Sequence, residues 1–138
     1  MPETQAVYYR DAMGREPVDA FLDALKPAAA QLALDNTCDL LNGLPVSAPP
    51  LAFPHSSQIE GALRELRCHY GKRLFRVLYQ RSDNLFVLLH VIEKTTAAVP
   101  VADITLAKSR FADFQARMDA SPRVPPRPAG QDAPPRSR

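Results

Sequence analysis

The chain has 138 residues, of which 46% are hydrophobic and 23% are charged, and its formal net charge is +2. This length and composition predict one globular domain with a core of ordinary size and leave no room for a second. The small net charge excludes a strongly basic nucleic-acid-binding chain, so a site for RNA must come from local clustering of cations.

The two cysteines and the N-terminus indicate where the protein resides. Cys38 and Cys68 lack the close spacing of a metal motif and the context of a secreted disulfide framework, which favours buried reduced thiols. The N-terminus has no apolar run of signal-peptide length, and no stretch of ~18 consecutive apolar residues occurs. We therefore expect a soluble, cytoplasmic protein without a membrane segment.

The first third of the chain predicts a strand and then two helices. Residues 5–10 are rich in Val and Tyr, which favours a strand, and residues 11–16 favour a turn. Pro17 suits the first position of a helix, while Pro27 ends that helix and can open another. Apolar side chains recur at helical spacing in both segments: Val18, Phe21, Leu22 and Leu25, then Leu34, Cys38 and Leu41. The pair predicts an antiparallel two-helix hairpin.

A proline-rich connection and three strands follow. Residues 44–57 contain four prolines, which predicts an extended connection without regular structure. Gly71-Lys72 suits a two-residue hairpin loop, because glycine tolerates the positive φ that its first position needs. The resulting register pairs Leu66 with Val77 on an apolar face and Arg67 with Arg76 on the other face. The last of the three strands, residues 85–92, is apolar almost throughout and should be central, covered on both faces.

The facing arginines are the most informative feature of this predicted hairpin. Like charges directly opposite each other destabilise a sheet by roughly 0.2–1 kcal/mol unless something offsets them. A counter-ion, the neighbouring Glu65 or an anionic ligand such as a phosphate would do so. A solvated strand face, with the arginine stems lying over apolar neighbours, explains the pair equally well.

The end of the chain predicts a helix and then a tail. Pro100 can begin the helix, whose apolar face consists of Ile104, Ala107, Phe111, Phe114 and Met118. From residue 121 onward prolines and arginines alternate without any hydrophobic period, so residues 121–138 should form a disordered tail. Residues 1–120 then form an α+β domain in which helices cover one face of a mostly antiparallel sheet. Its parts are an N-terminal strand, the helix hairpin, a three-stranded meander and a C-terminal helix.

Several short motifs resemble the RelE/HigB superfamily of toxins, in particular its phage-derived HigB-like branch. The matching residues are Gly14, Pro17, Val18, Phe21 and Leu22; Glu65-Leu66-Arg67; residues 75–79; Leu89-His90; Lys94; and Pro100 followed by Asp103-Ile104, Ala107 and Arg110. The order and spacing of these motifs together are specific for this superfamily, although no single motif is. The resemblance covers nearly all of the chain before the tail and implies a RelE-like fold.

The resemblance implies a toxin of a type II toxin–antitoxin pair. Such a toxin is a ribosome-dependent endoribonuclease that cleaves mRNA, inhibits translation and is silenced by an antitoxin, most simply a small helix-turn-helix protein. Ribosome and mRNA are then its other partners, and this self-cleavage chemistry of RNA needs no metal or cofactor. The gyrase-inhibiting ParE-like toxins share this fold, and a non-catalytic module that binds ribosome or antitoxin is a further alternative.

The implied chemistry needs cations for the phosphate, a base for the 2′-hydroxyl and an acid for the leaving oxygen. Arg67 and Arg76 match two arginines of the family and suit bidentate phosphate binding. Lys94 matches the first of two family lysines, whereas Thr95 stands in place of the second, a departure that bears on catalytic strength.

Proton transfer and RNA positioning have several candidates. His55 is the candidate histidine for proton transfer, while His90 reads better as a hydrogen-bonded core residue and His69 as an exposed hairpin residue. Tyr79 falls on the same side of its predicted strand as Val77, so its ring should pack in the core. Lys72, Arg73 and Arg81 flank the hairpins and could contact the RNA backbone, although surface solvation accounts for them equally well.

Overall fold

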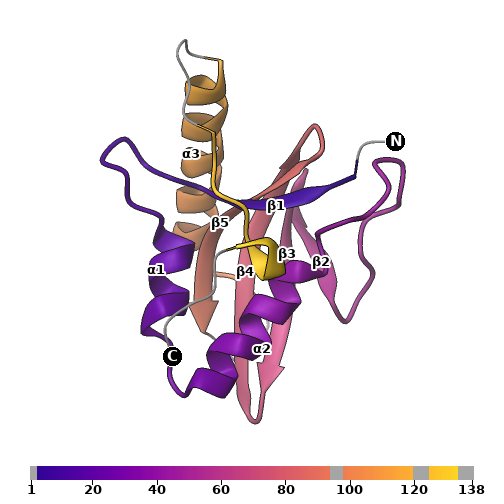
Figure 1. Ribbon diagram of the computed structural model, residues 1–138, viewed down its shortest axis with the longest axis vertical. Helices are drawn as coiled ribbons and strands as arrows, with labels where there is room; N and C mark the ends of the chain where they lie inside the picture. Colours follow the sequence, from indigo (N-terminus) through magenta and orange to yellow (C-terminus); the bar gives the residue numbers. More distant parts are fainter. Residues whose placement is uncertain (1–2, 94–97, 120–124, 134–138) are drawn as a thin grey trace.

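The computed structural model describes residues 3–93, 98–119 and 125–133, which form a mixed α+β domain around one five-stranded sheet (Figure 1). The elements in chain order are β1 (Gln5–Tyr8), α1 (Pro17–Ala24), α2 (Ala28–Asp39), β2 (Ser56–Glu60), β3 (Leu63–Tyr70), β4 (Arg73–Ser82), β5 (Leu85–Glu93), α3 (Val101–Met118) and the 3₁₀ helix η1 (Gly130–Asp132). The strand order is β1-β5-β4-β3-β2, and only the β1–β5 pair is parallel. None of the helices in these residues is long and apolar enough to cross a membrane.

The sheet is covered on both faces, so the domain has three layers. Alternate residues of β1 and the residue that follows it show this directly, because Ala6 and Tyr8 pack with α1 and α2, whereas Val7 and Tyr9 pack with α3. The predicted arrangement with helices on one face is therefore wrong. The reason is that an amphipathic pattern tells which side of a helix is buried but not which face of the sheet receives it. We call the two faces the α1/α2 face and the α3 face.

The β3–β4 hairpin has the predicted register. Leu66 pairs with Val77 and Arg67 pairs with Arg76. Gly71 has a φ of +60° in the turn, as the two-residue loop requires. Strand β5 is interior, between β1 and β4, and Val87, Leu88 and Leu89 are fully buried, which agrees with its continuous apolar sequence.

Strand β2 was not predicted. Its first two residues, Ser56 and Ser57, belong to the segment that was expected to lack regular structure, and they pair with Leu66 and Glu65 of β3. The segment Ser56–Glu60 contains little alternation of apolar and polar side chains. Pairing with β3 stabilises it instead, which is a tertiary interaction that the local pattern does not report.

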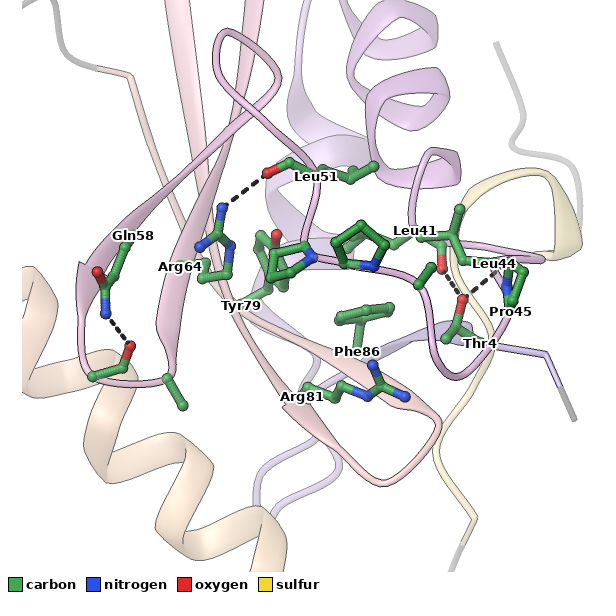
Figure 2. Close-up of a pocket in the computed structure, with 15 residues that line it drawn as sticks. Thr4, Leu41, Leu44, Pro45, Leu51, Gln58, Arg64, Tyr79, Arg81 and Phe86 are labelled. Atoms are coloured by element: carbon green, nitrogen blue, oxygen red, sulfur yellow. Dashed lines mark hydrogen bonds between the residues drawn. The ribbon is translucent and has the colours of Figure 1, made fainter.

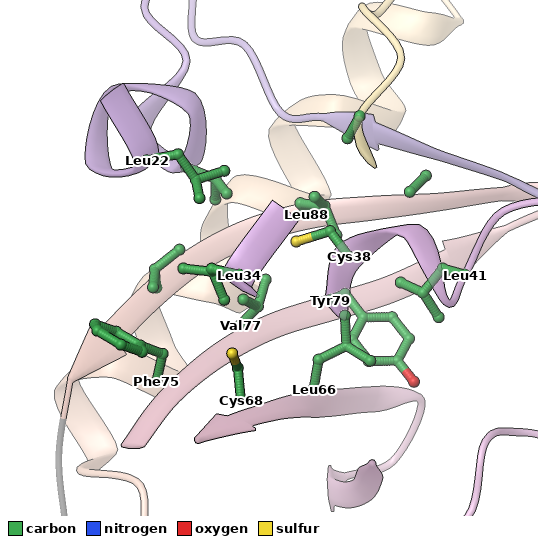
Figure 3. Close-up of a cluster of buried hydrophobic side chains, with 14 of the residues drawn as sticks. Leu22, Leu34, Cys38, Leu41, Leu66, Cys68, Phe75, Val77, Tyr79 and Leu88 are labelled. Carbon is green, nitrogen blue, oxygen red and sulfur yellow. The ribbon is translucent and has the colours of Figure 1, made fainter. Parts of the chain in front are cut away.

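The main core lies between the sheet and the helices α1 and α2. Figure 3 shows Phe75, Val77 and Tyr79 of β4 together with Cys68 of β3, below Leu34 of α2. Cys38 and Cys68 are buried thiols in this cluster, as predicted, and burial raises the pKa of the Cys68 thiol. Tyr79 is 1% exposed and its hydroxyl lies 2.7 Å from the hydroxyl of Ser56, so its predicted core position is confirmed.

Part of the predicted tail is packed against the domain, which corrects the expectation of disorder for residues 125–133. The backbone N–H of Tyr8 donates to the carbonyl of Arg127 at 3.0 Å, and that of Ala129 donates to Ala6 at 2.8 Å. The Arg127 guanidinium lies 2.8 Å from the carboxylate of Glu16 and 2.9 Å from that of Asp19. Backbone pairing and ion pairs hold this segment across the outer edge of β1, and neither produces a hydrophobic period in the sequence (Figure 1).

Helix α3 is joined to the end of β1 by a tyrosine. The Tyr9 hydroxyl donates to Asp113 Oδ2 at 2.6 Å, and Arg117 lies 2.9 Å from the same carboxylate oxygen. Burial and this hydrogen bond raise the pKa of Tyr9 from its usual value near 10 to about 12. The same hydrogen bond lowers the pKa of Asp113.

Replacing Gly130 should release the packed tail. A β-carbon at this position would lie 2.7 Å from Asn42 Nδ2 and 2.9 Å from Asp39 Cα, and the φ of +73° also disfavours a side chain. We expect Gly130→Ala to lower the free energy of unfolding by roughly 2–3 kcal/mol. Gly14→Ala is the matched control, because Gly14 has a φ of +83° with nothing within 4 Å. Equal losses of stability in chemical denaturation would show that the tail does not pack at Gly130.

The Tyr9 hydrogen bond predicts a loss of stability at high pH. Because folding raises the pKa of Tyr9, its contribution is present below the unfolded pKa near 10 and is lost as the pH rises towards about 12. We expect the stability of wild type to fall more steeply over this window than that of Tyr9→Phe, which carries no titrating hydroxyl. Denaturation midpoints measured from pH 8 to 11.5 test this, and parallel curves for the two proteins would contradict it.

Candidate functional site

The candidate site lies on the α3 face of β3, which becomes more exposed beyond Leu63 and Glu65 towards His69. Helix α3 packs over β4 and β5 through Ala107, Phe111 and Phe114. Beyond the helix, β3 presents alternate side chains on the same face. These are Glu65, Arg67 and His69, which are respectively buried, half-buried and exposed.

Glu65 is the counter-ion of the facing arginines. Its Oε1 atom lies 3.0 Å from Arg67 Nη1 and 3.2 Å from Arg76 Nε, and its side chain is 2% exposed. Arg76 is equally buried at 3%, whereas the Arg67 side chain is 18% exposed. One carboxylate oxygen therefore lies within ion-pair distance of two guanidinium groups, which offsets the repulsion between them. Of the two arginines, Arg67 is the one that an external anion can reach.

An exposed aromatic ring extends this site. Phe53 is 70% exposed, and the guanidinium carbon of Arg67 lies 5.5 Å from the centre of its ring. An Arg–Phe pair of this kind is stabilised by a cation–π interaction. Exposed aromatic rings beside cations also provide stacking platforms for nucleic-acid bases. Sequence reasoning missed Phe53, although a large aromatic residue inside a proline-rich connection is a signal that could have found it.

The three histidines have different surroundings. His55 is exposed at the start of β2, and its carbonyl accepts a hydrogen bond from the backbone N–H of Arg67 at 2.9 Å, which places it next to the cluster along the backbone. His69 is exposed on the same face as Arg67, two residues further along β3. His90 Nε2 lies 2.7 Å from Asp103 Oδ1, and its Nδ1 accepts from Arg110 at 3.3 Å. Both ring nitrogens of His90 are thus engaged, as expected for a structural histidine.

The predicted RNA-backbone cations are not gathered beside Arg67. Arg73 and Arg81 have the strand parity of the α1/α2 face and stand near opposite ends of β4. Arg73 forms a two-pronged ion pair with Glu93 at 2.7 and 2.9 Å, which lowers the pKa of that carboxyl. Arg81 donates to the carbonyls of Asp83 and Val46. Lys72 alone remains exposed, in the β3–β4 turn.

Lys94, together with Thr95 beside it, lies outside the described residues. Within the described ranges, no group of three or more His, Cys, Asp or Glu side chains is placed to hold a metal ion. The cations that the described residues bring to the site are Arg67 and Arg76. A guanidinium can bind a phosphate with two parallel hydrogen bonds, although Arg67 Nε itself is buried.

Residues 20–112 match the family described as phage-derived protein Gp49-like (DUF891). This range includes the arginine cluster and strands β2 to β5. The chain belongs to this Gp49-like family. The family is associated with toxins of toxin–antitoxin pairs, which points to an antitoxin partner. No curated protein matches the chain. The Gp49-like match ends inside α3, so the packed segment 125–133 lies outside it.

Removing Arg76 should destabilise this Gp49-like domain. Arg76 is 3% exposed, so its loss would leave the buried Glu65 carboxylate with one cation fewer. We expect Arg76→Ala to lower the free energy of unfolding by roughly 3 kcal/mol. Arg73→Ala, which removes a solvent-exposed pair at the start of the same strand, should change it far less. Equal denaturation midpoints for the two variants would contradict the buried-cluster interpretation.

Proposed function

We propose that this Gp49-like protein is the toxin of a type II toxin–antitoxin pair and cleaves mRNA on the ribosome. The observation that supports this most is the Glu65–Arg67–Arg76 cluster on the α3 face of the sheet. Two guanidinium groups share one buried carboxylate there, and Arg67 reaches the surface beside the exposed ring of Phe53. The family's association with toxins supports the same conclusion.

The site has groups suited to the three requirements of RNA self-cleavage. In that reaction the 2′-hydroxyl loses its proton and attacks the adjacent phosphorus, while the bond to the 5′-oxygen breaks and that oxygen gains a proton. Arg67 would bind the phosphate and stabilise the negative charge that develops on it. Arg76, held on the other side of Glu65, would position Arg67. Phe53 would stack on a neighbouring base and hold the backbone in register.

The proton carriers in this proposal are histidines. His55 and His69 are both exposed close to Arg67 along the backbone, one from the start of β2 and one from β3. Histidine is the side chain whose ordinary pKa suits transfer in both directions near neutral pH. Lys94 remains a candidate for further positive charge. Lys72, exposed in the neighbouring turn, would contact the RNA backbone.

A non-catalytic module that binds ribosome or antitoxin is the second candidate. The burial of Arg76 favours it, since a guanidinium that is 3% exposed does not reach an external phosphate without rearrangement. Such a module would bind its partner through Arg67 and Phe53 and leave the message intact. Cutting of the message therefore separates the two candidates.

Arg67→Ala should strongly reduce cutting, and because it also removes a partner of the buried Glu65 carboxylate, circular dichroism checks that the variant is folded. When the chain is induced without its antitoxin, we expect wild type to create new 5′ ends within translated messages. Arg67→Ala should reduce these ends by about 100-fold, because it removes one preorganised donor to the developing charge. Mapping of 5′ ends measures this directly.

The matched control for this experiment is Arg15→Ala, which removes an exposed arginine between β1 and α1 and should cut like wild type. Full cutting by Arg67→Ala would contradict the assignment. Growth arrest without new ends would favour inhibition of gyrase, and no arrest would favour the non-catalytic module.

A further inference from the structure

A cavity of about 390 Å³ lies on the α1/α2 face, opposite to the arginine cluster (Figure 2). Its walls come from the proline-rich segment 44–51 on one side and from the sheet on the other. The apolar lining includes Leu41, Tyr79 and Phe86. Cavities of about 300–1,000 Å³ with a mostly apolar lining are typical of binding sites. We call this cavity the 44–51 pocket.

The polar groups of the 44–51 pocket are selective for negative charge. Arg64 and Arg81 line it, and no acidic side chain is among its lining residues in the described part of the chain. Each arginine anchors the proline-rich segment through one Nη2 atom, Arg64 to the Leu51 carbonyl at 2.9 Å and Arg81 to the Val46 carbonyl at 2.8 Å. Arg64 Nε is buried without a hydrogen-bond partner in the described residues.

The pocket adjoins a free sheet edge. Strand β2 is the last strand of the sheet, and neither a strand nor an isolated bridge pairs with its outer side within residues 3–93, 98–119 and 125–133. Gln58 of β2 and Gly61 of the following turn both line the pocket. An exposed edge strand offers backbone donors and acceptors to an added chain. This adjacency favours a polypeptide over a small molecule as the occupant.

We propose that the 44–51 pocket is a docking site for the antitoxin. An aromatic or branched aliphatic side chain of the antitoxin would enter between Tyr79, Phe86 and the proline-rich wall, and an adjacent Asp or Glu would pair with Arg64. Large apolar anchors in a desolvated pocket carry much of the affinity of an interface. The proposal rests on the toxin–antitoxin part of the proposed function and is independent of RNA cleavage.

Ala62→Trp tests the proposal without removing any contact. Ala62 is exposed in the β2–β3 turn and lines the pocket, so a larger side chain there would obstruct it. The probe is the purified product of the gene beside this one, and calorimetry measures its affinity for the full chain. We expect Ala62→Trp to weaken binding at least tenfold and Arg64→Gln to weaken it about fivefold. The matched control Ala12→Trp, exposed in the turn between β1 and α1, should bind like wild type.

Three outcomes would overturn the proposal. The first is wild-type affinity of the Ala62→Trp variant for the probe, and the second is no binding of the probe by the wild-type chain. The third is binding of 4-phenylbutyrate in the pocket without competition against the antitoxin, which would make the pocket a small-molecule site. The double variant Arg67→Ala, Arg76→Lys separates this test from the proposed function. We expect it to bind the antitoxin normally even though it does not cut message, because the arginine cluster lies on the opposite face of the sheet.

Discussion

The buried carboxylate of Glu65 makes the arrangement of the α3 face possible. Arg67 and Arg76 stand directly opposite each other in adjacent strands. Like charges in such positions disfavour strand pairing unless a counter-ion offsets their repulsion. With Oε1 at 3.0 and 3.2 Å from the two side chains, the repulsion between them is compensated inside the sheet. Arg67 is the more exposed of the two arginines, and so the interaction that stabilises the hairpin also brings a cation towards the surface at the candidate site.

The two faces of the sheet differ in the size of the core that they hold and in the candidate site that they carry. The α1/α2 face holds the larger core and ends at the pocket beneath the proline-rich segment. The α3 face holds a smaller core under the helix, which includes Leu63 of β3, and β3 becomes exposed only further along, at His69. If the antitoxin docks in the pocket, its first contact is on the opposite face from Arg67. An antitoxin bound there would reach Arg67 only through a segment that passes around the β2 edge.

The edges of the sheet also differ. Residues 127–129 pair with β1 and give its outer edge a partner from the same chain. Strand β2, at the other end, has its outer edge without a strand partner in the described residues. A covered edge cannot accept another strand, whereas an uncovered one can, which directs intermolecular pairing to the β2 side. The packed tail therefore contributes to stability and also limits where a partner strand can add.

The amino-acid sequence by itself determined the features that depend on local periodicity and turn chemistry. Helical spacing in residues 17–25, the glycine at position 71 and the alternation along β3 and β4 were sufficient to predict helix α1 and the Arg67–Arg76 pairing. Only the tertiary structure decided that α3 covers the second face, that Ser56–Glu60 becomes a strand and that residues 125–133 pack. It also decided that Arg76 is buried on Glu65 and that Phe53 stands beside Arg67. These features arise from contacts between segments far apart in the chain, whose free energy depends on burial and geometry that no local pattern records.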